Sequence, residues 1–404
     1  MIDYSPKHLI MVVPGSNNNK YYDMIPNGDM WTANYGRIGS SSQSRRYSKF
    51  QWESKYNEKI RKGYVDQTDM VKDLITAKPN SKSQYKEISN RSIASIVMRL
   101  QDMAHKAIEA NYTVSSNKVT QIMVDEAQNI ITGLLEIKDI EQFNSELVRL
   151  FTTIPRKMGS VSSYIANNSN EFNKIISREQ DLLDVMKGQV VQKMVIDDQI
   201  DEQTINDKTI LETLGLVFEE CDNNDIAIIK VALGSCADKF CNAWRVKNIK
   251  TQKRFEQFVT DNGIKDIRLL FHGSRNENWW SIIQSGLVLR PTNAVITGKM
   301  FGYGIYYAPK ARKSLGYTSL NGSYWAKGNS DSGFMALMNV AYGKPYDVYS
   351  FNSKYYSFNY NELQNVCPGA NCLHAHEGSM LKNDEIIVYK EDQSTIKYLV
   401  EIKN

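Results

Sequence analysis

Four residues in the C-terminal half have types and surroundings that suit a binding site for a flat ligand. His272 follows an apolar run in FHGS, and Tyr306 lies in the glycine-rich segment GKMFGYGIYYA. Tyr317 ends ARKSLGY, and Glu385 begins the apolar run EIIVY. Glycines allow close backbone approach, tyrosines stack on rings, and a partly buried carboxylate stabilises positive charge. The set suits a nucleotide or nicotinamide better than a metal ion.

The sequence pattern changes twice along the chain and so divides it into three regions, which must position these residues. Residues 1–75 combine short apolar runs with turn residues, which predicts a small β-rich domain, and 76–88 are interpreted as a linker. Across 89–208 apolar residues recur at helical spacing, with Pro155 ending the third stretch. Residues 209–404 hold short β-rich runs between loops of Gly, Ser and Asn. We therefore expect an α+β protein of several domains.

Composition narrows the setting in which the protein works. The chain of 404 residues has a net charge of only +4, so any nucleic-acid surface must be a local patch. Apolar runs are too short to span a membrane, and no membrane partner is expected. Five cysteines argue against a disulfide framework. An intracellular location is expected: the nucleus in a eukaryote, the cytoplasm or nucleoid in a bacterium.

Five segments, in their order and spacing, resemble the catalytic domain of the poly(ADP-ribose) polymerase family. They are LLFHGSR, TGKMFGYGIYYA, ARKSLGY, ALMNVAYGKP and NDEIIVY. Upstream, LVRLFTTIPRKMG and EQDLLDVMKG resemble the helical regulatory domain of the DNA-activated members, and WTANYGRIGSSSQS resembles their WGR domain. The resemblance implies a WGR-like DNA-binding domain (1–75), a helical regulatory domain (89–208) and a catalytic domain with the diphtheria-toxin-like ADP-ribosyltransferase β-sheet fold (209–404).

The resemblance also implies roles in transferring ADP-ribose from NAD+, the expected substrate, without a metal. The family's catalytic histidine, tyrosine and glutamate match His272, Tyr306 and Glu385. The residues expected to bind NAD+ are Gly273, Ser274, Asn278, Ser314, Tyr317 and, on the regulatory helix, Asp184. Met300 and Lys313 match an acceptor-side methionine and a residue leading to the stacking tyrosine. Glu385 would stabilise the oxocarbenium-like transition state as nicotinamide leaves.

A basic stretch near the N-terminus predicts contact with DNA. Between residues 35 and 62, eight basic residues are opposed by two acidic ones. In the WGR-like context Arg37, Arg45 and Arg46 are expected to grip phosphates at strand breaks, either 5′-phosphorylated ends or nicks. A solvated helix face is the plainer interpretation of KYNEKIRKGYVD. Tyr35 replaces the tryptophan of the WGR signature, which weakens the expectation for that residue.

Three functions remain open. The first is a DNA-break-stimulated enzyme of the DNA damage response that transfers ADP-ribose, and extends chains, on protein acceptors including itself. The second is a mono-ADP-ribosyltransferase that modifies protein or DNA ends. The third, of another class, is a DNA-end binding protein with weak or no catalysis. Gln180 stands where relatives often carry an acidic residue, which could alter autoinhibition by the helical domain.

Four residues near the C-terminus have side chains that could bind zinc. Cys367, Cys372, His374 and His376 have suitable side chains, but their spacing matches no common zinc finger. We expect no metal. Asp384 adjoins Glu385, and two neighbouring carboxylates could raise one another's pKa, although neighbours on a strand point opposite ways.

Overall fold

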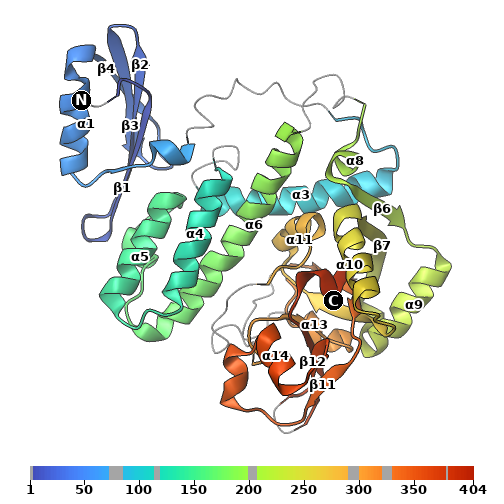
Figure 1. Cartoon of the computed structure of the whole chain (residues 1–404). Helices are drawn as coiled ribbons and strands as arrows, with labels where there is room; N and C mark the ends of the chain where they lie inside the picture. Colours follow the sequence, from blue (N-terminus) through green and yellow to red (C-terminus); the bar gives the residue numbers. More distant parts are fainter. Residues whose placement is uncertain are drawn as a thin grey trace. The chain divides into compact units, whose positions relative to one another are not determined.

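The computed structural model describes residues 3–71, 85–112, 119–198, 207–289, 300–320, 330–378 and 381–404. It combines sheets and helices, which confirms the expected α+β class. The chain forms two compact units (Figure 1): Met1–Lys82 with Lys106–Lys193, and Ser83–His105 with Met194–Asn404. Most of the expected linker, 76–84, lies outside the described residues. No described helix is long and apolar enough to cross a membrane.

The first unit begins with a five-stranded antiparallel sheet and one helix. The strand order is β4-β3-β2-β1-β5. The elements are β1 (Lys7–Val13), β2 (Asn18–Asn27), β3 (Met30–Arg37), β4 (Gln43–Ser48), α1 (Trp52–Arg61) and β5 (Val65–Asp66). Alternate residues on one face form a core around Trp31, which stacks on Tyr47 and meets Trp52 of α1 edge-on. The sheet therefore has one face closed by α1.

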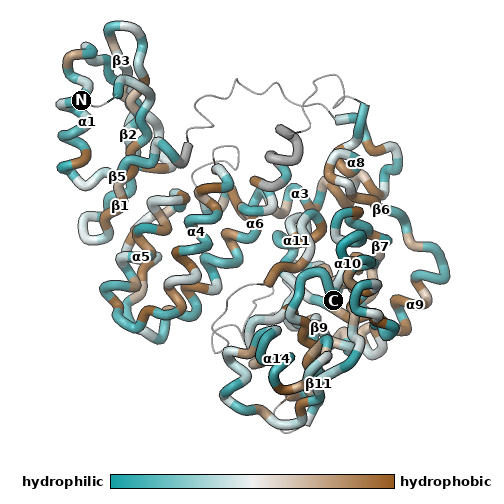
Figure 2. Tube along the Cα trace, viewed as in Figure 1, coloured by the Kyte–Doolittle hydropathy of each residue, from teal (hydrophilic) through white to brown (hydrophobic). Residues whose placement is uncertain are grey.

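The remainder of the first unit is helical. Its elements are α4 (Gln121–Leu134), α5 (Ile140–Thr153) and most of α6 (Phe172–Asp198). Figure 2 shows brown and teal segments alternating along these helices, as expected where each buries one face. Asp139 caps the start of α5 by accepting from the Gln142 amide, and α5 ends two residues before Pro155.

The second unit contains two sheets, which one isolated β-bridge joins. One sheet has the order β6-β7-β14-β10-β8 and the other β11-β12-β13-β9. Its strands are β6 (Leu216–Glu220), β7 (Phe240–Asn248), β8 (Ile267–Gly273), β9 (Ile305–Tyr307), β10 (Ser332–Ala341), β11 (Pro345–Val348), β12 (Cys372–Ala375), β13 (Glu385–Val388) and β14 (Ser394–Lys403). Its shorter helices are α8 (Ile210–Leu214), α9 (Asn223–Leu233), α10 (Ile249–Asp261), α11 (Trp279–Ser285), α13 (Ala311–Leu315) and α14 (Tyr360–Val366). Phe271 and Ala308 form an isolated bridge that joins β8 of the first sheet to the chain just after β9 of the second.

Most of α3 (Arg91–Asn111) belongs to the second unit, although the sequence grouped it with the helices that follow. The Arg99 guanidinium donates to Glu401 Oε1 at 2.8 Å and to Ser332 Oγ at 2.5 Å. It also lies over the Phe334 ring, 5.0 Å from its centroid. Glu401 is buried, so its carboxylate relies on this arginine for its charge partner. The contact between α3 and β10 and β14 explains the grouping.

We predict that Arg99→Ala lowers the free energy of unfolding of the second unit by about 1–3 kcal/mol, because it leaves the buried Glu401 carboxylate without its cation. Chemical denaturation monitored by circular dichroism measures this change. Lys310→Ala is the control, because Lys310 and its partner Glu377 are both exposed. The control should change stability by less than about 1 kcal/mol. Equal destabilisation of the two variants would contradict the prediction.

Candidate active site

His272, Tyr306 and Glu385 converge because their strands are neighbours. His272 lies near the end of β8, Tyr306 in β9, and Glu385 is the first residue of β13. β13 pairs with β9 in a register that sets Ile387 opposite Tyr306. His272 Nδ1 lies 3.0 Å from the Tyr306 carbonyl oxygen. The structure therefore brings together the three residues that the sequence named as catalytic.

The last residue of β8, Gly273, is pressed closely against α13. A Cβ on Gly273 would lie 2.1 Å from the Ser314 carbonyl oxygen, so only glycine fits there. Ser314 itself is buried. Beyond Gly273, Asn278 Nδ2 donates to Ser274 Oγ at 3.1 Å. Four of the residues expected to bind NAD+ thus lie in direct succession or contact.

The Glu385 carboxylate is buried and faces the ammonium group of Lys313. Lys313 Nζ forms a short ion pair with Glu385 Oε1. Glu385 Oε2 is buried and has no hydrogen-bond partner among the described residues. Burial raises the pKa of Glu385 above its ordinary value, and Lys313 opposes this shift. The unpaired oxygen is therefore an acceptor available to a ligand hydroxyl.

Tyr306 and Tyr317 lie close enough to Glu385 for its charge to raise their pKa values. Burial raises the pKa of Tyr306 well above its ordinary value, and the charge of Glu385 adds to the shift. Burial also raises the pKa of Tyr317, where Lys313 opposes the shift and Glu385 adds to it. Lys313 Nζ lies 5.7 Å from the Tyr317 ring centroid. Both phenols stay protonated at neutral pH and can donate a hydrogen bond.

The sequence does not predict the ion pair that Lys313 forms with Glu385. In the family resemblance Lys313 matches only a residue leading to the stacking tyrosine. Its side chain lies on α13 and reaches β13, a contact that no spacing along the chain indicates. Burial would lower its pKa, but the contacts with Glu385 and Tyr317 together outweigh burial, and the pKa of Lys313 is raised. The ammonium group therefore stays charged beside the carboxylate.

Asp384 and Glu385 face different partners, as expected for neighbours at the start of a strand. Asp384 Oδ1 accepts from the Glu377 amide at 2.7 Å, and Oδ2 lies 3.4 Å from His374 Nε2. Burial would raise the pKa of Asp384, but the Glu377 amide and His374 lower it below its ordinary value. The mutual increase in pKa that adjacency suggested is not found.

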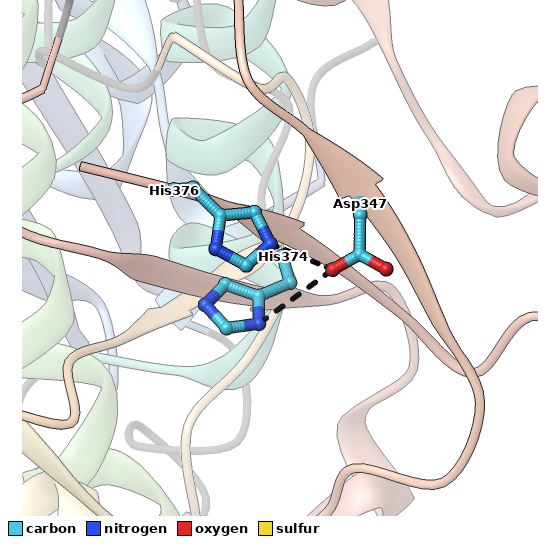
Figure 3. A group of neighbouring side chains, drawn as sticks. All are labelled: Asp347, His374 and His376. Carbon is cyan, nitrogen blue, oxygen red and sulfur yellow. Dashed lines mark hydrogen bonds and ion pairs between the residues drawn. The ribbon is translucent and has the colours of Figure 1, made fainter. Parts of the chain in front are cut away.

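The cysteines weighed for a zinc site do not gather with the histidines. All five cysteines are free. In the part of the chain that the structure describes, the group that could hold a metal is Asp347, His374 and His376 (Figure 3). Cys372 is buried on β12, and burial raises the pKa of its thiol to about 12. Neither Cys367 nor Cys372 belongs to that group.

The remaining predicted site residues lie in the first unit. Asp184, on α6, accepts from Gln180 Nε2 at 2.8 Å, and Gln180 also exchanges hydrogen bonds with Gln128. The Arg37 guanidinium donates to the carbonyl oxygens of Asn17 and Gly159. The proposed roles of Asp184 in NAD+ binding and Arg37 in DNA binding stay predictions.

Several basic side chains of the stretch 35–62 contact neighbouring carboxylates or aromatic rings. Glu58 forms ion pairs with both Lys55 and Lys62. Lys59 lies over the Tyr22 ring, 4.0 Å from its centroid, and burial lowers the pKa of Lys59. These contacts engage three basic residues of the stretch, and DNA binding by the stretch stays a prediction. Arg45 and Arg46 remain exposed on the edge strand β4.

Comparison with known proteins agrees with this geometry. The family described as Poly(ADP-ribose) polymerase catalytic domain matches residues 231–404. The poly(ADP-ribose) polymerase-like protein 100L of Invertebrate iridescent virus 6 is 33% identical over 189 residues, which span 46% of this chain and 97% of the viral protein. This chain belongs to the poly(ADP-ribose) polymerase family.

More distant relatives match along more of the chain. Poly [ADP-ribose] polymerase 2 of Arabidopsis thaliana is 20% identical over an alignment spanning 99% of this chain and 71% of the plant protein. The maize Poly [ADP-ribose] polymerase 2 is 22% identical over 81% of this chain and 56% of its own length. This member of the family is thus an NAD+ ADP-ribosyltransferase, which confirms the expected family and enzyme class.

We predict that Lys313→Met in this ADP-ribosyltransferase moves the acidic limb of its pH–rate profile to higher pH. Burial raises the pKa of Glu385 and Lys313 opposes the rise, so removing the ammonium leaves the effect of burial unopposed. Nicotinamide release measured between pH 5 and 9 reports the shift. Lys310→Met is the control, because Lys310 pairs with the exposed Glu377. An unchanged acidic limb in Lys313→Met would show that Glu385 does not set it.

Proposed function

We propose that this enzyme transfers ADP-ribose from NAD+ to protein side chains, including its own, releases nicotinamide, and is stimulated by DNA strand breaks. The carrying observation is the buried Glu385 carboxylate, which has one oxygen on Lys313 and the other without a hydrogen-bond partner among the described residues. A buried acceptor oxygen left unpaired costs stability, which suits a site that a substrate hydroxyl completes.

The roles of the surrounding residues follow from their positions and from the family resemblance. The backbone of Gly273 and the Ser274 hydroxyl would hold the nicotinamide carboxamide, with the Tyr317 ring stacked on the pyridinium. His272 would bind the adenosine ribose. Glu385 Oε2 would accept from the nicotinamide ribose and stabilise positive charge on that sugar as the glycosidic C–N bond breaks.

The bond changes balance without a further reactant. The electron pair of the broken C–N bond leaves with nicotinamide, which departs neutral. An acceptor oxygen forms the new bond to the sugar carbon, and Glu385 accepts the proton of that hydroxyl and passes it to solvent. Raising the pKa of Glu385 by burial favours this second role, because it makes the carboxylate a better base.

Stimulation by DNA is assigned to the N-terminal sheet. Arg45 and Arg46 are adjacent on β4, so their side chains point to opposite faces at the edge of the sheet. A phosphate backbone that meets both would run along that edge. Such contacts read no sequence, which suits recognition of a strand break. We infer a role in the DNA damage response within the cell.

We predict that Glu385→Gln lowers nicotinamide release at least about a hundredfold, because the amide cannot stabilise a developing positive charge. Wild type and variant are assayed with and without a nicked duplex carrying a 5′-phosphate, and products are resolved on a gel. Glu377→Gln makes the same change at an exposed site and should act as wild type. A protein-bound ladder supports polymer formation, and a single added unit favours mono-transfer. No release by wild type with any broken DNA would overturn the proposal.

We also predict that Arg45→Ala with Arg46→Ala weakens DNA binding and reduces DNA stimulation while leaving DNA-independent release unchanged. For each phosphate that the variant no longer neutralises, the slope of log K against log salt should become shallower by about 0.9. Fluorescence anisotropy with the nicked duplex measures both quantities. Arg91→Ala removes an exposed arginine at the start of α3 as the charge control. Equal salt slopes for wild type and the double variant would show that these arginines do not contact DNA phosphates.

A further inference from the structure

Two histidines and an aspartate meet on the second sheet without taking part in the proposed transfer. Asp347 is on β11 and His374 on β12, and the parallel register of these strands sets the two directly opposite each other. His376 follows two residues later and so lies on the same face as His374. Figure 3 shows both imidazole rings turned with one nitrogen edge toward the Asp347 carboxylate.

The three potential ligand atoms are spaced closely enough for one ion. Asp347 Oδ1 lies 2.7 Å from His376 Nε2 and 4.0 Å from His374 Nδ1. Ligands at tetrahedral positions around zinc are about 3.3 Å apart, given bonds of about 2.0–2.1 Å. The two distances bracket that value. The candidate ligand atoms of all three residues lie within 4.8 Å of one another.

Aromatic contacts hold the two imidazoles in place. The rings of His374 and His376 stack with centroids 3.9 Å apart and an interplanar angle of 22°. Tyr349 stacks on His376 with centroids 4.4 Å apart and an angle of 7°. Such support reduces the ordering that ligand side chains must undergo when an ion binds.

A second carboxylate is positioned to orient the buried histidine. Asp384 Oδ2 lies 3.4 Å from His374 Nε2, on the far side of the ring from Asp347. In this geometry the two atoms form no hydrogen bond, and His374 Nε2 is buried without a hydrogen-bond partner among the described residues. When an ion binds Nδ1, a proton on Nε2 would turn toward Asp384, as in carboxylate–histidine–metal arrangements. The Tyr342 hydroxyl, 2.8 Å from Nδ1, can donate to that lone pair. A bound ion would displace that hydrogen bond.

We propose that Asp347, His374 and His376 form a binding site for a divalent transition-metal ion of the zinc type, with water completing the coordination. Imidazole nitrogens select such ions, whereas calcium and magnesium prefer all-oxygen sites. The site is separate from the transfer reaction. Through Asp384, which directly precedes Glu385, the ion would fix the start of the strand that carries the catalytic carboxylate.

The test uses the full chain, freed of metal with a chelator and titrated with Co²⁺. We expect one ion per chain, visible d–d absorption bands typical of a low-symmetry site, and disappearance of those bands when Zn²⁺ is added. Asp347→Asn and His376→Gln should each weaken binding at least tenfold. Asp384→Asn should weaken it about 10–100-fold, as removal of an outer partner does. Circular dichroism checks that each variant is folded.

Two controls separate this site from other chelation. His105→Gln removes an exposed histidine on α3, and Cys367→Ser removes a thiol outside the group. Both should bind Co²⁺ as wild type does. Binding that survives Asp347→Asn unchanged would mean adventitious chelation by histidine alone and would overturn the proposal. Absence of stoichiometric binding by the folded wild type, or weakening in Cys367→Ser equal to that in His376→Gln, would overturn it as well.

Discussion

The ion pair between Lys313 and Glu385 is the contact on which the arrangement of the active site depends. A carboxylate buried at the start of β13 would be protonated more readily than in water, and the ammonium keeps the charged form accessible. The lysine can reach it only because α13 lies against β8. That approach in turn requires Gly273, where any side chain would strike the Ser314 carbonyl oxygen. One electrostatic requirement thus connects a glycine, a helix and two strands from separate sheets.

The local chemistry of the site could be predicted from the sequence, because it resides in short segments with strong preferences. His272, Tyr306 and Glu385 each lie at or near the end of an apolar β-rich run, and those runs became β8, β9 and β13. Helical spacing likewise located the start of α3 within two residues, and Pro155 indicated where α5 stops. These features depend on residues that are close along the chain.

Features set by tertiary contact could not be predicted in this way. The pairing of Lys313 with Glu385, and of Asp347 with His374, joins segments far apart in sequence. The fate of the basic stretch was also hidden, because a count of charges does not show that Glu58 pairs with two lysines at once. The grouping of α3 with the catalytic strands rests on Arg99 and the buried Glu401, again a distant contact.

The parallel pairing of β11 and β12 has a consequence for the order in which this region forms and opens. Parallel neighbours need a long crossover, here residues 349–371 with α14, whereas the other strand pairs described in these two sheets are antiparallel. Bringing the two ends of that segment together costs chain entropy before any hydrogen bond between β11 and β12 forms. β11 is also an edge strand with a single neighbour in its sheet. Its amides should therefore be among the last of the sheet to gain protection during folding and among the first to exchange with solvent from the native state.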